Sequence, residues 1–290
     1  MNLMITGAGG QLGHELTRLG GHHELLAIDR DELDITDYNA VTACLDQFKS
    51  DAVINAASYT AVDRAESDVE AAFAVNRDGP ANLARACQRA GIPLIHVSTD
   101  YVFDGSKQGA YAEDDPAAPL GVYGTSKLAG EQAVLKNCSK SIILRTSWVF
   151  SAHGNNFVKT MLRLGSERET LGIVADQHGC PTSAAELARA IYTVLDRGLD
   201  DNHWGVYHFC QSEPTTWLAF AEAVFEVAKE NGVALNVKTP NAITSADYPT
   251  PVKRPANSVM NCSKFSQAFE FEIKPWSESL QEVIKELKHV

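Results

Sequence analysis

The sequence predicts an α/β protein with a doubly wound parallel sheet and a smaller, mixed α/β domain towards the C-terminus. Three observations support this fold class. Short apolar runs alternate with segments of helical period from residue 2 to residue 146, as in successive βαβ units. A glycine-rich turn directly follows the first apolar run. Beyond Trp148 the alternation loosens, and Asn-, Gly- and Pro-rich stretches separate the helical segments.

The expected elements follow one another as in a parallel sheet with crossover helices. Apolar runs typical of strands occupy 2–6, 24–28, 51–57, 93–98, 141–146 and 205–210. Helical patterns begin at about Gln11 and continue with 37–48, a segment ending at 84–91, 122–131 and 181–198. The last two strands can still belong to the main sheet. We therefore predict a nucleotide-binding sheet domain of residues 1–147, to which 183–210 returns, and a substrate-binding domain of 148–182 and 211–290.

The composition argues against several classes of protein. A formal net charge of −12 over 290 residues, with no long run of Lys or Arg, disfavours binding to nucleic acid. The six cysteines are dispersed without a CxxC pair, so we expect free thiols in a reducing compartment. The N-terminal stretch lacks the pattern of a secretion signal, and no apolar run approaches the roughly 20 residues that span a bilayer. We therefore expect a cytoplasmic protein without a membrane partner.

The glycine-rich turn is the first candidate binding site. Gly7, Gly10 and Gly13 form a GxxGxxG pattern between the first strand and the first helix. Such glycines permit a tight turn, close approach of a pyrophosphate and close packing of helix on strand, while the helix N-terminus offers N–H groups to phosphate. Asp29 ends the second strand, where an acceptor for a ribose 2′-hydroxyl is expected. The combination predicts a Rossmann-type dinucleotide site rather than a plain glycine turn.

Three further polar residues lie where an open α/β fold binds ligands. Thr99 stands at the carboxyl edge of the sheet, and Tyr123 and Lys127 lie four residues apart at the start of a helix, hence on one face. Taken singly, they are better explained as a strand-end hydroxyl and an ordinary surface helix. Together with the dinucleotide turn, they resemble the catalytic residues of the short-chain dehydrogenase/reductase superfamily.

Longer motifs resemble one family of that superfamily, the dTDP-4-dehydrorhamnose reductases. In the order of that family, the chain contains the stretches TGAGGQLG, STDYVFDG, VYGTSKLAGE, ILRTSWVF, GNNFVKTMLRL, DQHGCPT and RPANS. The resemblance covers nearly the whole chain. It implies reduction of dTDP-4-dehydro-L-rhamnose to dTDP-L-rhamnose, a sugar donor for bacterial cell-surface polysaccharide, with NADPH or NADH as cofactor.

The expected chemistry explains the Tyr-Lys pair. Reducing a ketone requires a proton for the oxygen as hydride reaches the carbon, and a free tyrosine, with a pKa of about 10, is poorly matched to this at neutral pH. We expect the Lys127 ammonium to lower the pKa of Tyr123 and to hold the nicotinamide ribose. Thr99 is expected to hydrogen-bond the same ketone oxygen.

The resemblance also implies positions for ligand contacts. Those of the cofactor are Gly7, Gly10, Gln11, Leu12 and Gly13 around the pyrophosphate, Asp29 and Arg30 at the adenosine ribose, Asp34 and Ile35 at the adenine, Ser58, Tyr59 and Thr60 along its middle section, and Tyr123 and Lys127. Those of the substrate are Thr99, Asp100, Trp148, Asn156, Gln177 and Arg254. For Arg254, a solvated surface charge is an equal alternative.

Metal binding and assembly stay open. Some members of the family are described with Mg²⁺ held by carboxylates at a dimer interface, and Glu15 matches one such position. Only Glu186 stands in 183–190, where the partner acids are expected, and Mg²⁺ prefers several oxygen ligands. A Mg²⁺-linked dimer is therefore in doubt, and the chain is expected to be a monomer or a homodimer.

Four alternative functions share some of these features. A nucleotide-sugar 4-epimerase uses the same three residues but consumes no reduced cofactor overall, and another 4-ketoreductase makes the C4 epimer. A regulatory protein resembling the β subunit of methionine adenosyltransferase needs no catalysis, which intact Thr99, Tyr123 and Lys127 argue against. A 4,6-dehydratase is disfavoured because Tyr101 follows Asp100 where a second acid is needed.

Overall fold

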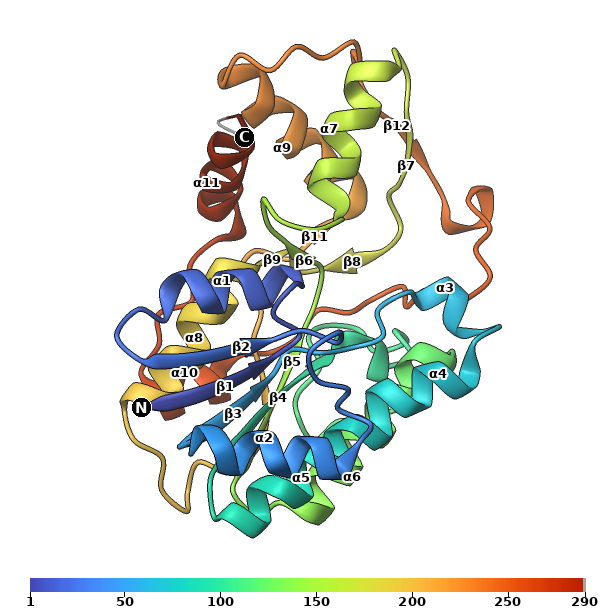
Figure 1. Ribbon diagram of the computed structural model, residues 1–290. Helices are drawn as coiled ribbons and strands as arrows, with labels where there is room; N and C mark the ends of the chain where they lie inside the picture. Colours follow the sequence, from blue (N-terminus) through green and yellow to red (C-terminus); the bar gives the residue numbers. More distant parts are fainter. Residues whose placement is uncertain (289–290) are drawn as a thin grey trace.

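A six-stranded, entirely parallel sheet forms the centre of the computed structural model, which describes residues 1–288 (Figure 1). Its strands, in spatial order, are β10 (Gly205–His208), β5 (Ser141–Thr146), β4 (Leu94–Thr99), β3 (Ala52–Asn55), β1 (Asn2–Thr6) and β2 (Glu24–Ile28). The last two predicted strands both belong to this sheet. The predicted doubly wound parallel sheet is confirmed.

Helices cover both faces of the sheet. On one face lie α1 (Gln11–Leu19), α8 (Ala184–Asp196) and α10 (Ser263–Phe269), and on the other α2 (Tyr38–Phe48), α5 (Gly79–Ala90) and α6 (Val122–Asn137). Within β1, Leu3 and Ile5 pack in the cluster with α1, α8 and α10, and Met4 packs in the cluster with α2, α5 and α6. Because both faces are buried, the strands are continuous apolar runs, which is why the sequence reveals them.

The smaller domain packs around its own apolar cluster. It contains α7 (Phe157–Glu167), α9 (Trp217–Glu230), α11 (Trp276–Lys288) and the parallel pair β7 (Gly172–Val174) and β12 (Asn241–Ile243), seen in the upper part of Figure 1. Two further pairs are β6 (Val149–Phe150) with β9 (Thr182–Ser183), and β8 (His178–Gly179) with β11 (Thr215–Thr216). This domain is mixed α/β, as predicted.

We propose that the domains follow these apolar clusters. The return of 183–210 to the sheet then corresponds to α8, which packs on α1, and to β10, which pairs with β5. One segment differs from the predicted boundary. Phe265 and Phe269 of α10 pack in the cluster of the sheet, although the prediction placed all of 211–290 in the smaller domain.

The short elements lie near the carboxyl edge of the sheet or in the long connections. They are α3 (Val62–Ala65), α4 (Val69–Phe73), the π-helix η1 (Ala74–Asp78), and the 3₁₀ turns η2 (Asp100–Val102) and η3 (Ser245–Asp247). The strand β1 has β2 on one side and β3 on the other, so the chain reverses direction across the sheet at β1. Open α/β sheets bind ligands at the carboxyl side of such a point. Within residues 1–288, no helix is both long and apolar enough to cross a membrane.

Candidate active site

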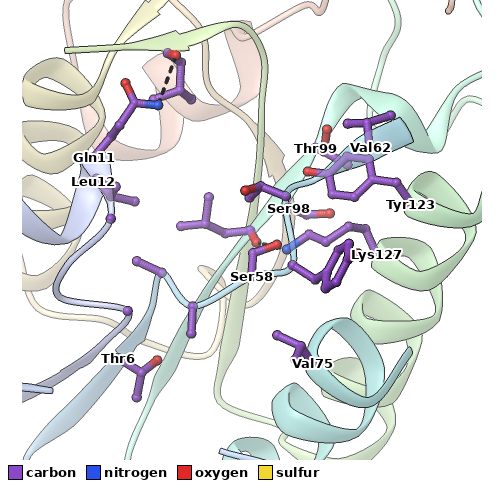
Figure 2. Close-up of a pocket in the computed structure, with 18 of the residues that line it drawn as sticks. Thr6, Gln11, Leu12, Ser58, Val62, Val75, Ser98, Thr99, Tyr123 and Lys127 are labelled. Carbon is purple, nitrogen blue, oxygen red and sulfur yellow. Dashed lines mark hydrogen bonds between the residues drawn. The ribbon is translucent and has the colours of Figure 1, made fainter. Parts of the chain in front are cut away.

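A cleft of about 1230 Å³ opens at the carboxyl edge of the sheet. Its walls come from the ends of β1, β3, β4 and β5, from the turn before α1, and from α3, α4 and α6 (Figure 2). The predicted site residues that line it are Gly7, Gly10, Gln11, Leu12, Asp29, Arg30, Asp34, Ile35, Ser58, Tyr59, Thr60, Thr99, Asp100, Tyr123, Lys127 and Trp148. Residues from six separate stretches of sequence therefore meet in one cavity.

The glycine turn forms the end of the cleft next to α1. Gly7 has a φ of 77°, and a Cβ there would lie 2.6 Å from the backbone nitrogen of Ala57. Gly13 does not line the cleft, but a Cβ on it would overlap the Gly7 carbonyl, so it allows α1 to pack on the turn. Gly10 is the N-cap of α1 and supplies no side-chain cap. The first N–H groups of α1 are thus left for an anion.

Asp29 and Arg30 lie at the end of β2, beside this turn. The Asp29 carboxylate accepts a hydrogen bond of 2.8 Å from the backbone nitrogen of Arg30. The Arg30 side chain forms no ion pair with any residue of the described chain, and Glu32 instead accepts from the backbone nitrogen of Asp29. A carboxylate and an uncommitted guanidinium therefore stand next to each other at the cleft.

A buried asparagine connects two segments of the chain that border the cleft. The Asn76 side-chain oxygen accepts from Ser58 Oγ at 3.0 Å and from the Tyr59 backbone at 2.8 Å. Its nitrogen donates to the Tyr59 carbonyl and to Ser126 Oγ. Asn76 lies in η1 and is fully buried. It joins the loop after β3 to α6, a role that sequence reasoning missed because neither the π-helix nor its partners follow from local spacing.

Thr99, Tyr123 and Lys127 converge in the middle of the cleft (Figure 2). Thr99 ends β4 and donates to the Asp100 carboxylate at 2.9 Å. Tyr123 lies in the first turn of α6, and its ring packs edge-on against Tyr101, with ring centroids 5.4 Å apart. One turn later, Lys127 Nζ donates to the Val97 carbonyl at 2.7 Å. Tyr123 and Lys127 therefore lie one turn apart on α6, as their spacing predicts.

The electrostatics of the pair differ from the prediction. Burial raises the pKa of Tyr123, and a hydrogen bond with Thr99 only partly opposes this. The pKa of Tyr123 is raised rather than lowered as expected, because desolvation dominates and the Lys127 ammonium is bound to the Val97 carbonyl. Burial also lowers the pKa of Lys127 to about 8, against the opposing charge of Glu131.

Asp100 is a second unusual acid in the cleft. It is fully buried, and desolvation raises its pKa to about 6 although hydrogen bonds with Ser258 and Thr99 favour the charged form. Strongly perturbed groups of this kind gather at functional sites.

Trp148 forms the wall of the cleft on the side of the smaller domain. Its φ of 48° is in the left-handed region, which a bulky residue rarely adopts without support from its surroundings. The indole stacks on Trp217, with centroids 3.5 Å apart and planes inclined by 9°, and Phe157 packs against Trp217. Trp217 has no signal in the sequence, because its contact with Trp148 arises only when α9 packs against the loop after β5.

Three predicted substrate residues lie beside the cleft without lining it. Asn156 donates to Gln11 Oε1 at 3.0 Å and caps α7, and Gln177 donates to Ser245 Oγ. Arg254 forms an ion pair of 2.7 Å with Asp63 and donates to the Tyr101 hydroxyl at 3.0 Å. The alternative of a solvated charge at Arg254 is wrong, since its side chain is only 20% exposed and both of its terminal nitrogens donate hydrogen bonds.

Comparison with known proteins identifies the family. The model of the RmlD substrate binding domain matches residues 1–289. A dTDP-4-dehydrorhamnose reductase from Aggregatibacter actinomycetemcomitans is 48% identical over 97% of each chain. The chain belongs to the dTDP-4-dehydrorhamnose reductase family. Solved members from Clostridium acetobutylicum and, in complex with NADP, from Bacillus anthracis match with TM-scores of 0.92 and 0.91 at 37% and 34% identity, over at least 98% of each chain.

In this member of the reductase family, Glu15 is not placed as a Mg²⁺ ligand. Glu15 and Glu186 are both buried, and each is paired with an arginine three residues later, Arg18 and Arg189. A carboxylate that already neutralises a guanidinium offers little charge to a metal, and two carboxylates are few for an octahedral ion. These residues do not fit a resident Mg²⁺, so we assign no role to that metal.

Proposed function

We propose that this chain reduces the C4 ketone of dTDP-4-dehydro-L-rhamnose to give dTDP-L-rhamnose, using NADPH or NADH. The observation that carries the proposal is the convergence of Thr99, Tyr123 and Lys127 in the cleft that also contains the glycine turn of α1. The full-length match to reductases of that name supports the choice of substrate. The product would supply rhamnose for cell-surface polysaccharide.

The glycine turn and its neighbours fit a dinucleotide. The uncapped first turn of α1 would bind the pyrophosphate, and Asp29 and Arg30 would face the adenosine ribose. The adenine would lie along Asp34 and Ile35, and the middle of the cofactor along 58–60. When bound, the reduced nicotinamide supplies the hydride. The solved Bacillus anthracis relative in complex with NADP supports this assignment.

The residues of α6 and β4 would supply the proton to the ketone oxygen. Tyr123 carries its proton at neutral pH and can donate it to the ketone oxygen, although burial raises its pKa and makes the phenol a weaker acid in the resting state. Thr99 would hydrogen-bond the same oxygen and orient the carbonyl. As negative charge develops on Tyr123, the nearby Lys127 ammonium would stabilise it more strongly than it does in the resting state.

The sugar would lie between Tyr123 and the wall formed by Trp148 and Trp217. Two stacked indoles offer a flat apolar surface, which suits the face of a deoxysugar. Asp100 would accept a hydrogen bond from a sugar hydroxyl. Asn156 and Arg254 would act by fixing Gln11 and Tyr101, whereas Gln177 would position the loop around Ser245.

The compartment and assembly are part of the same proposal. All six cysteines are free, which fits the reducing cytoplasm. The chain would work there as a monomer or a homodimer.

One experiment tests the proposal directly. The purified chain is supplied with dTDP-4-dehydro-L-rhamnose and NADPH, cofactor oxidation is followed by absorbance, and the product is identified by NMR. We expect one NADPH consumed per sugar and dTDP-L-rhamnose as product. Formation of the C4 epimer of that product would assign another 4-ketoreductase activity, conversion without net cofactor use would assign an epimerase, and absence of turnover would favour a non-catalytic role.

A further inference from the structure

We propose that His22, His23 and Asp196 form a zinc site at the amino edge of the sheet. The two histidines lie in the turn between α1 and β2, and Asp196 is the last residue of α8. β2 starts directly after this turn and ends at the cleft, so the cluster and the cleft lie at opposite edges of the sheet (Figure 1). The cluster takes no part in the reduction.

The geometry of the three side chains matches a shared ion. One ligand atom from each lies within 4.8 Å of the other two. His22 Nε2 is 3.0 Å from Asp196 Oδ2, and His23 Nε2 is 3.3 Å from Asp196 Oδ1. Two ligands at about 2.0–2.1 Å from a tetrahedral zinc ion are roughly 3.3 Å apart. Both nitrogen–oxygen separations are close to this value, and one histidine faces each oxygen of the Asp196 carboxylate.

His23 provides an independent indication of a ligand. Its side chain is only 4% exposed, and its Nε2 has no hydrogen-bond partner even though Asp196 is 3.3 Å away. Leaving a buried polar atom unpaired is unfavourable, so such an atom calls for a partner.

The surrounding packing holds the ligands in place. Tyr192, one turn before Asp196 on α8, stacks on the His23 ring with centroids 5.3 Å apart. Its hydroxyl donates to the Leu16 carbonyl of α1, and Gly20 leaves room for its ring. Because this hydroxyl is bound to the Leu16 carbonyl, Tyr192 supports the site without being a ligand. The site thus rests on two helices that pack together.

The types of ligand in the cluster favour zinc over magnesium. Two imidazoles and one carboxylate suit a borderline ion such as Zn²⁺, whereas Mg²⁺ prefers oxygen ligands alone. The side chains of His22 and Asp196 are about half exposed, at 54% and 46%, so water has access to complete a tetrahedral shell. Bound zinc would link the turn before β2 to the end of α8.

Calorimetry with zinc chloride tests the proposal on the full chain, after tag removal and treatment with a chelator. We expect one zinc per chain and an affinity at least about tenfold weaker in Asp196→Asn and in His22→Ala. With cobalt chloride, the intense visible bands of a tetrahedral ion should appear and be lost in His22→Ala. Absence of binding at one equivalent, or unchanged affinity in both variants, would overturn the proposal.

The chain supplies a matched control. His203 Nδ1 pairs with Asp200 at 2.8 Å on the same side of the molecule, but no second histidine completes a set with them among the described residues. We expect His203→Ala to bind zinc as the parent does, and a loss of binding there would count against the assignment. If His23→Ala does not fold without the ring that packs on Tyr192, the exposed His22 still decides the outcome.

Discussion

At the scale of single residues, burial governs the chemistry of the cleft. Tyr123, Lys127 and Asp100 are each taken out of water, and each has a pKa displaced towards its neutral form. The sequence predicted the residues and their shared face. It could not predict the direction for Tyr123, because desolvation depends on how Tyr101 and α6 close around the phenol.

Tyr123→Phe tests the assignment of the proton donor. We expect turnover to fall by roughly 10²–10⁴, because the positioned acid is lost while the ring keeps its packing against Tyr101. Cofactor affinity, measured by fluorescence titration, should stay within a few-fold of the parent. A variant with nearly normal kcat would remove Tyr123 from the mechanism.

Arg30→Ala tests how the cleft distinguishes NADPH from NADH. Asp29 favours the ribose hydroxyls of NADH and repels the 2′-phosphate of NADPH, whereas the unpaired Arg30 can bind that phosphate with a charge-assisted contact of roughly 1.5–3 kcal/mol. We therefore expect the parent to use both cofactors with a modest preference for NADPH, and the variant to shift towards NADH by about tenfold or more. The measurement is kcat/KM for both cofactors, and an unchanged ratio would show that Arg30 does not read the phosphate.

Asp100→Asn tests the raised pKa of Asp100 through the pH dependence of folding stability. The folded carboxyl has a pKa of about 6 against an ordinary 3.8, so folding stability falls as pH rises from about 4 to about 6 and the loss is complete above that range. Asparagine stays neutral, so its stability relative to the parent should grow by roughly 1–2 kcal/mol between pH 5 and pH 8, at the cost of activity. Urea unfolding at both pH values measures this. A difference that does not depend on pH would contradict the raised pKa of Asp100.

At the scale of elements, the sequence predicted the strands and turns that depend on neighbouring residues. It did not predict the features that depend on contacts between distant segments. The apolar runs of β1 and β5 were clear because both faces are buried, and the glycine turn stood directly between a strand and a helix. The strand expected at 51–57 ends at Asn55, because the chain then leaves the sheet to pack on Gly7. The π-helix around Asn76 and the contact of Trp217 with Trp148 depend on packing between distant segments, which no local pattern encodes.

Gly13→Ala tests the packing of α1 on the turn. The new methyl would overlap backbone atoms of Gly7 and Ala8, which have no flexible end to move aside. We expect a loss of about 1–3 kcal/mol in the free energy of unfolding, and a drop in cofactor affinity because the N-terminus of α1 is displaced. Gly21→Ala is the control, since nothing lies within 4 Å of a Cβ there. Equal effects of the two changes on cofactor affinity would contradict a specific role for Gly13.

At the scale of the whole molecule, the active site is assembled from both domains. Trp148 stacks on Trp217 of the smaller domain, and the long segment that returns from this domain includes Ser258, whose hydroxyl donates to the His178 carbonyl. Arg254, in the same segment, reaches back to Asp63 of α3 and to Tyr101. These contacts hold the C-terminal segment against the side of the cleft that contains Tyr123.

The pair of Arg254 and Asp63 distinguishes a structural link from a direct contact with the substrate. As a link, Arg254 acts by fixing Tyr101, which packs against Tyr123. Arg254→Ala and Asp63→Asn should then each raise the KM of the nucleotide sugar by a similar factor, about tenfold, and the double variant should be no worse than either. The KM of the cofactor should not change.

If Arg254 instead binds the diphosphate itself, the two variants should act in opposite directions. Removing the Asp63 charge would free the guanidinium, so Asp63→Asn would leave the KM of the sugar unchanged or lower it, while Arg254→Ala would raise it. Stability will not separate the two cases, because a partly exposed ion pair contributes only about 0–1 kcal/mol. The exposed pair of Lys238 and Glu169 provides the control, since Lys238→Ala should leave both KM values unchanged. The steady-state constants of these variants therefore decide whether Arg254 positions Tyr101 beside the sugar or binds the diphosphate of the nucleotide sugar directly.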